Sequence, residues 1–125
     1  MNFSPTVSIG TNPTDDKRYE GDSCTPEGEF RIIARRPHRS WNYFLLLNYP
    51  TPASYRKHNA AKRDGLIPRN TTVGNAIGIH GVPKGNDAWI SQRENWTLGC
   101  VSLKTAAIRE IYSITQNGTK VRIQP

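Results

Sequence analysis

Short segments of alternating or continuous hydrophobicity run along the chain, and their lengths predict β-strands. Residues 6–9 alternate polar and apolar side chains, as do residues 30–35, whereas residues 42–49 form a nearly continuous apolar run that predicts a more buried strand. Pro50 and Pro52 end that run, because proline cannot donate to a central strand ladder. The expected strands are residues 6–9, 30–35, 42–49, 76–80, 99–103 and 120–124, of which 99–103 is short enough to be a turn.

Two segments have the composition or the periodicity of a helix. Residues 53–64 contain good helix formers and stop at Gly65. In residues 105–116, Thr105 is placed to cap a helix whose apolar side chains share one face, and Asn117-Gly118 ends it. Residues 14–29 and 81–96 are polar or rich in turn formers and predict long loops. The pattern therefore predicts a mainly β domain with one or two helices.

The length and composition narrow this picture. With 125 residues the chain has the size of one domain, and we expect a single domain over residues 1–125. Its longest apolar run, residues 43–47, is far shorter than the roughly 20 residues of a membrane span. The first ten residues lack a basic start followed by an apolar stretch, so no signal peptide is expected within this chain. A net charge of +7 favours anionic partners.

His80 and Cys100 are the candidate catalytic pair. Each lies at the end of an apolar, strand-like segment and beside a glycine, and residues 81–98 connect them as a loop that would cover the pair if the two strands are neighbours. An imidazole near a thiol promotes formation of the thiolate, the nucleophilic species. From the residues alone, the alternative stays open that Cys100 is a buried core thiol and His80 a hydrogen-bonded residue at a strand end.

Two motifs in the same order resemble those of the L,D-transpeptidases of the YkuD type. The segment Lys17–Ile32 is similar to the family pattern K-x-x-G-D-x-x-T-P-x-G-x-F-x-I. Downstream, Ile79-His80-Gly81 is followed by a loop and by Trp96–Leu103 (WTLGCVSL), which resembles the branch of the family with a Trp-Thr-x-Gly-Cys motif. Many members carry Arg or Asn two residues after the cysteine, where this chain has Ser102.

This resemblance implies a fold, a reaction and a set of site residues. The fold is a small β-sandwich or open-barrel-like catalytic domain, here without the further strands with which family members usually begin. The reaction is cysteine-dependent acyl transfer on peptidoglycan stem peptides through a thioester, without metal or cofactor, in the cell envelope or periplasm and open to carbapenem-type inhibitors. Cys100 would be the nucleophile, His80 the base and the Gly81 carbonyl its orienting group. Backbone N–H groups of Leu98, Gly99 and Cys100 would form the oxyanion hole, and Tyr49, Trp96, Thr97 and Ser102 would contact substrate.

Other functions remain open at this stage. Water in place of an acceptor amine would make the enzyme an L,D-carboxypeptidase or an amidase, including a toxin that attacks a cell wall. The basic cluster Arg31–Arg39, with Trp41 and Tyr43 nearby, would suit a non-catalytic module that binds wall polymer or nucleic acid, but no nucleic-acid motif accompanies it. Cys24, which has no histidine or glycine turn beside it, is expected to be an incidental exposed thiol.

Overall fold

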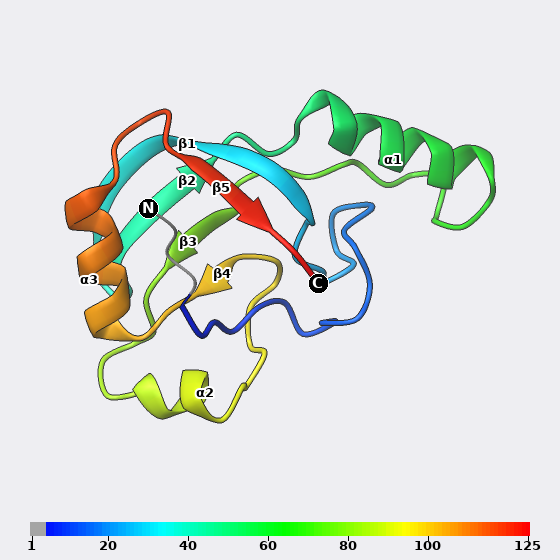
Figure 1. Ribbon diagram of the computed structural model, residues 1–125. Helices are drawn as coiled ribbons and strands as arrows, with labels where there is room; N and C mark the ends of the chain where they lie inside the picture. Colours follow the sequence, from blue (N-terminus) through cyan, green and yellow to red (C-terminus); the bar gives the residue numbers. More distant parts are fainter. Residues whose placement is uncertain (1–4) are drawn as a thin grey trace.

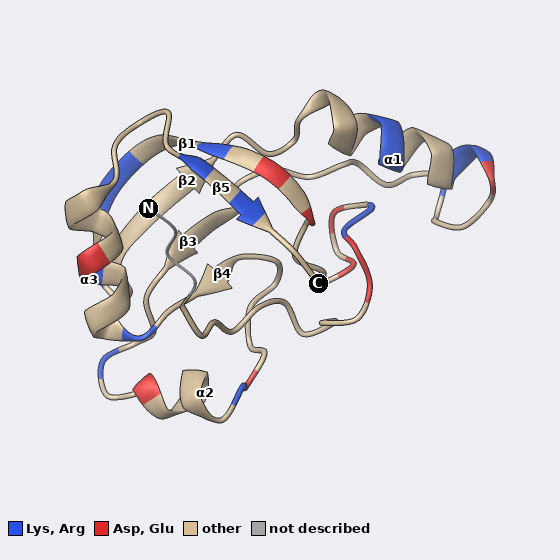
Figure 2. Cartoon of the chain, in the orientation of Figure 1, with Lys and Arg blue, Asp and Glu red and all other residues tan. Residues whose placement is uncertain are grey.

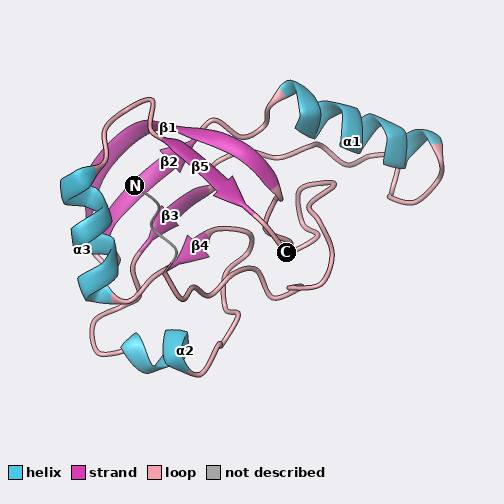
Figure 3. Ribbon diagram, viewed as in Figure 1, coloured by secondary structure: helices cyan, strands magenta, loops and turns pink. Residues whose placement is uncertain are grey.

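A computed structural model describes residues 5–125 and contains one curved, five-stranded sheet with helices at its periphery (Figure 3). The strand order is β4-β3-β2-β1-β5. The strands are β1 Gly28–His38, β2 Asn42–Leu47, β3 Gly78–His80, β4 Val101–Ser102 and β5 Lys120–Ile123. The helices are α1 Pro52–Arg63, α2 Asp87–Ser91 and α3 Thr105–Ile114. The mainly β class is confirmed, but the described chain has three helices and not one or two, because α2 forms inside the loop predicted for residues 81–96.

The centre of the sheet is an antiparallel hairpin of β1 and β2 (Figure 1). Its register runs from Ile32 opposite Leu47 to His38 opposite Asn42, with an irregularity between Ile32 and Ala34. The first four residues of β1 pair on the other side with β5. β1 is therefore longer than the alternation of residues 30–35 predicts, since it has partners on both sides.

One face of the sheet forms the core and packs against α3. Side chains alternate along a strand, so Leu45 and Leu47 of β2 point to this face together with Ile79 of β3. Ile108 of α3 is completely buried against them, and the rings of Tyr43 and Tyr112 stack with centroids 3.9 Å apart. Phe44, Leu46 and His80 belong to the opposite face, which carries the candidate site.

The N-terminal segment covers the edge of β4 without forming a strand. Ser8 exchanges two backbone hydrogen bonds with Ser102, and Gly10 makes an isolated bridge to Thr97. The strand predicted for residues 6–9 is therefore reduced to isolated bridges, one to β4 and one to Thr97 in the preceding turn.

Helix α1 extends away from the sheet and carries several of the basic residues (Figures 1 and 2). Thr51 caps it in a reciprocal arrangement with Ser54, and Lys57 and Lys62 attach it to the body through Asp16 and the Thr71 carbonyl oxygen. These two lysines are therefore engaged within the protein. Within the described part of the chain, no helix has the length and apolar character needed to cross a membrane.

Candidate active site

The parallel pairing of β3 with β4 brings His80 and Cys100 to the same face of the sheet. Ile79 pairs with Val101 and His80 with Ser102. One step back along both strands, Cys100 stands beside Gly78, whose backbone N–H contacts its sulfur. Because side chains alternate, His80 and Cys100 point to one face as diagonal neighbours on adjacent strands. The sequence-predicted pair is thus assembled by strand register.

His80 is held by a backbone carbonyl. Its Nδ1 lies 2.7 Å from the Gly81 carbonyl oxygen, which only accepts, so Nδ1 carries a proton and Nε2 of the neutral ring has a free lone pair. The side chain is almost completely buried. Burial lowers the pKa of His80 from 6.5 to about 4, although the bond to Gly81 opposes this. The imidazole is therefore neutral at neutral pH and able to accept a proton.

Aromatic rings cover His80 and account for its burial. Trp41, from the turn between β1 and β2, stacks on the imidazole with centroids 4.0 Å apart, and Trp96 meets it edge-on at 5.5 Å. The Trp41 carbonyl oxygen also accepts the Gly81 N–H. Trp96, which was predicted to contact substrate, lies half-buried against the histidine. Trp41 was not predicted to lie there, because only the register of the hairpin brings that ring over β3.

Cys100 is partly accessible, and its sulfur lies 3.7 Å from the Ala76 carbonyl oxygen. Burial raises the pKa of the thiol, while the Gly78 N–H and the Lys17 ammonium act in the opposite direction. The resting sulfur is therefore a thiol. Any nucleophilic attack by this sulfur would require the loss of its proton, and a neutral His80 on the same face is suited to take it.

The turn before Cys100 depends on Thr97 and Gly99. The Thr97 hydroxyl donates to the Cys100 carbonyl oxygen at 2.6 Å and accepts the Gly99 N–H at 3.2 Å. Gly99 has a φ of +151°, and a Cβ there would lie 2.9 Å from the Cys24 carbonyl oxygen. Thr97 is buried and shapes the turn, so the structure gives it no surface for the predicted contact with substrate. The Gly99 N–H is engaged by Thr97, so of the three predicted oxyanion donors only the N–H groups of Leu98 and Cys100 remain as candidates.

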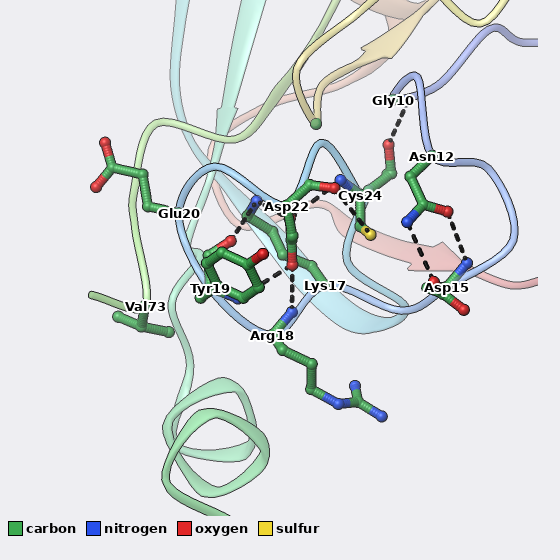
Figure 4. Close-up of polar contacts among 12 residues, drawn as sticks. Gly10, Asn12, Asp15, Lys17, Arg18, Tyr19, Glu20, Asp22, Cys24 and Val73 are labelled. Carbon is green, nitrogen blue, oxygen red and sulfur yellow. Dashed lines mark hydrogen bonds and ion pairs between the residues drawn. The ribbon is translucent and has the colours of Figure 1, made fainter. Parts of the chain in front are cut away.

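A buried ion pair between Lys17 and Asp22 lies near this turn, and Figure 4 shows the pair with the contacts around it. The Lys17 ammonium lies 2.9 Å from an Asp22 oxygen, and both side chains are more than nine-tenths buried. Asp22 also accepts backbone N–H groups of Arg18, Tyr19 and Cys24. Burial alone would raise the pKa of Asp22, but these donors outweigh it and hold the pKa below its usual value.

The Lys17–Asp22 pair reaches the nucleophile turn directly. The Lys17 nitrogen is 3.7 Å from the place that a Cβ of Gly99 would occupy. The segment Lys17–Asp22 (KRYEGD), at the start of the first motif, contains both residues, but the motif alone assigned them no role. The first motif of the chain therefore lies against the turn formed by the second, with Lys17 and the Cys24 carbonyl oxygen both close to Gly99.

Two further predicted substrate contacts are also internal. Tyr49 lies in the core, where its hydroxyl donates to the Val73 carbonyl oxygen at 2.6 Å, so it is no wall of a cleft. Ser102 is fully buried, and its hydroxyl donates to the Gly81 carbonyl oxygen at 3.1 Å. The Gly81 carbonyl thus accepts hydrogen bonds from His80 and Ser102 together. Ser102 positions the orienting group of the histidine.

Both cysteines are free thiols, and Cys24 differs from expectation in its burial. It is 2% exposed, and its sulfur contacts the Asp22 carbonyl oxygen. Burial and then the charge of Asp22 raise the pKa of Cys24 to about 11, so it is a poor nucleophile at neutral pH. Among the described residues, no group of three His, Cys, Asp or Glu side chains is arranged to hold a metal ion.

Solved structures share this fold. The helical cell shape determining protein Pgp2 from Campylobacter jejuni aligns with a TM-score of 0.66 at 21% identity, over 93% of this chain and 36% of that one. Bd1075 from Bdellovibrio bacteriovorus gives 0.60 at 21% identity, over 94% and 37%. An L,D-transpeptidase from Mycobacterium smegmatis gives 0.56 at 13% identity, over 97% and 48%. The chain therefore spans less than half the length of each of these proteins.

The sequence comparisons identify the family. No curated protein sequence matches the chain significantly. The family model YkuD, the L,D-transpeptidase catalytic domain, matches residues 1–123, which include both motifs and every residue of the site described above. By this match over nearly its whole length, the chain belongs to the YkuD family of L,D-transpeptidase catalytic domains.

Proposed function

We propose that this domain catalyses cysteine-dependent acyl transfer on peptidoglycan stem peptides. The observation that carries the proposal is the set of three groups on one sheet face: a partly accessible Cys100 thiol, a neutral His80 and the Gly81 carbonyl that orients the imidazole. A thiol, a base and a group that fixes the base are the parts that nucleophilic catalysis requires.

The first half-reaction forms a thioester. Nε2 of His80 takes the thiol proton as the Cys100 sulfur attacks the carbonyl carbon of the L-centre of the diamino acid in a tetrapeptide stem. The resulting oxyanion accepts hydrogen bonds from the backbone N–H groups of Leu98 and Cys100. The imidazolium then gives its proton to the nitrogen of the terminal D-alanine, the C–N bond breaks and D-alanine leaves.

The second half-reaction releases the acyl group. An amine of another stem attacks the thioester, His80 takes a proton from that amine, and the sulfur leaves and recovers the proton as a thiol. Water in place of the amine would give an L,D-carboxypeptidase through the same thioester. Transfer to an amine places the activity in cell-wall synthesis in the envelope, where carbapenem-type inhibitors would acylate the same sulfur.

The decisive experiment follows products by mass spectrometry. Purified disaccharide-tetrapeptide is incubated with the protein, with and without an acceptor stem. We expect loss of D-alanine together with a cross-linked product when the acceptor is present, and hydrolysis alone would assign a carboxypeptidase. Cys100→Ser should abolish turnover and keep substrate binding, whereas Cys24→Ser, the matched control, should retain activity. Undiminished turnover by Cys100→Ser would overturn the proposal.

Acylation provides a second test that does not depend on the natural substrate. A carbapenem should add one adduct to the wild type, measured by intact mass, and none to Cys100→Ala. An adduct that survives in Cys100→Ala would move the nucleophile to Cys24. His80→Ala should fold and acylate slowly, and acylation at the wild-type rate would remove His80 as the base.

A further inference from the structure

A small pocket opens on the same sheet face as Cys100, on the side away from the rings that cover His80. Its volume is about 190 Å³, below the roughly 300–1,000 Å³ of sites for drug-sized ligands and suited to one small amino-acid residue. The lining residues are Ala34, Arg36, Phe44, Leu46 and Ala76. Ala76 joins the pocket to the nucleophile, since its carbonyl oxygen contacts the Cys100 sulfur.

Strand register sets the order of groups across this face. Arg36 of β1 is paired with Phe44 of β2, and Phe44 is paired with His80 of β3. The Arg36 guanidinium carbon lies 5.3 Å from the centre of the Phe44 ring, and that ring lies 6.2 Å from the imidazole. A single aromatic ring therefore separates the guanidinium from the catalytic histidine.

Gly78 leaves room for the Phe44 ring beside the nucleophile. A Cβ at Gly78 would lie 2.6 Å from the tip of the Phe44 ring. With only hydrogen there, the ring lies across β3, and Arg36 approaches the same patch from the other side. A carboxylate one residue beyond a bond cleaved at Cys100 would lie about 4 Å further along the peptide. Arg36 and Ala76 line the same pocket, so a residue held there would have the guanidinium on one side and the nucleophile beyond Ala76 on the other.

The charge of Arg36 is available for a ligand. Arg36 is exposed and forms no ion pair with the described residues, whereas Arg18, Arg63 and Arg122 each pair with a carboxylate. The neighbouring Arg35 is engaged on the core face with Tyr112. Guanidinium is the side-chain group that matches a carboxylate with two parallel hydrogen bonds.

We infer that Arg36 binds the free C-terminal carboxylate of the residue released from the stem peptide, and that the pocket holds the small side chain of that residue. The inference rests on the proposed function. Many members of the family carry Arg or Asn two residues after the nucleophile, where this chain has Ser102. In this chain the arginine that recognises the carboxylate would come from β1 instead. Binding of the carboxylate by Arg36 would make the domain specific for the C-terminal residue of a peptide, because a residue inside a peptide has no free main-chain carboxylate.

The test compares two peptides and four proteins. The peptides are the stem tetrapeptide with a free C-terminal carboxylate and the same peptide with a C-terminal carboxamide. The proteins are the wild type, Arg36→Gln, Arg36→Lys and Arg39→Gln. The last removes the same charge from the nearby β1–β2 turn and serves as the matched control. Far-UV circular dichroism verifies that each variant is folded.

The wild type should prefer the carboxylate peptide by about 10- to 100-fold in kcat/KM, the scale of a lost charged hydrogen bond. Arg36→Gln should remove most of this preference by lowering the rate on the carboxylate peptide far more than the rate on the carboxamide peptide, Arg36→Lys should keep part of the preference, and Arg39→Gln should keep it all. An equal loss on both peptides, or a preference that persists undiminished in Arg36→Gln, would overturn the inference.

Binding to a Cys100→Ala background separates this inference from the proposed function. Dissociation constants of both peptides, measured by calorimetry with and without Arg36→Gln, need no turnover. If the wild type turns over neither peptide but the background binds the carboxylate form more tightly only when Arg36 is present, the acyl-transfer proposal fails and the assignment of Arg36 stands. Equal affinity for the two peptides in the presence of Arg36 refutes the assignment.

Discussion

The buried, neutral His80 should make the stability of the fold depend on pH in a calculable way. Its pKa is about 4 in the folded protein and 6.5 when unperturbed. Between these values the unfolded chain binds a proton that the folded chain does not, so the free energy of unfolding falls as the pH decreases from 6.5 to 4. Above pH 6.5 the contribution is fully present. The difference in pKa corresponds to about 3 kcal/mol between pH 7 and pH 4.

Urea unfolding followed by tryptophan fluorescence measures this contribution, since Trp41 stacks on the imidazole and should report the loss of the site. The comparison is between the wild type and His80→Gln at pH 7, 6, 5 and 4. The other ionisable groups are present in both proteins, so the difference between the two curves isolates His80. The absolute stability of the variant is not the measured quantity.

We expect the stability advantage of the wild type over His80→Gln to shrink by about 3 kcal/mol from pH 7 to pH 4. If the unfolding free energies of the two proteins changed in parallel with pH, the reasoning would be refuted, because His80 would then have the same pKa in the folded and the unfolded chain. The description of His80 as a base that rests without its proton near neutral pH would then be wrong as well.

Three further substitutions test other parts of the site and fold. Gly78→Ala places a Cβ 2.6 Å from the Leu45 carbonyl oxygen and the Phe44 ring, and should cost about 1–3 kcal/mol in urea unfolding; an unchanged midpoint contradicts the close contact. Lys17→Met removes the nearby cation and should raise the pKa of Cys100, read from the pH dependence of alkylation in a Cys24→Ser background; a lower pKa contradicts the assignment. Thr51→Ala removes the N-cap of α1 and should lower the free energy of unfolding by about 1 kcal/mol. An unchanged free energy of unfolding would contradict the capping interaction.

Local pattern predicted the elements that have strong local signals. The apolar run at residues 42–49 became β2, and the one-faced helix predicted near residues 105–116 became α3. Thr105 is not its cap as predicted, because the helix begins at Thr105 itself and Lys104 is the N-cap residue. Helix α2 was missed because five residues are too few to show a period, and its sequence lies within a polar loop. The strand expected at residues 6–9 was reduced to bridges, since pairing is decided by partners distant in sequence.

The candidate site divides in the same way. His80, Gly81 and Cys100 were found because a motif marks them. Trp41 and Arg36 were not assigned, because their relation to the site exists only through the register of the β1–β2 hairpin. Tyr49, Thr97 and Ser102 were expected to face substrate, and the structure buries all three. Proximity in sequence to a motif does not show whether a side chain is accessible, since Ser102 is paired with His80 on the same face and is nevertheless fully buried.

The group that orients His80, the Gly81 carbonyl, is part of the main chain, and this affects how the proposed acyl-transfer activity could be lost or tuned. No substitution can delete the oxygen of Gly81, and that oxygen has no ionisable proton and no formal charge to offset an imidazolium. Loss of orientation must therefore come indirectly, through neighbours that fix the local backbone, among which Ser102 and Trp41 are bonded to residue 81 itself. Substitutions that inactivate such a domain are therefore expected at buried positions that fix the backbone near Gly81 as well as at Cys100.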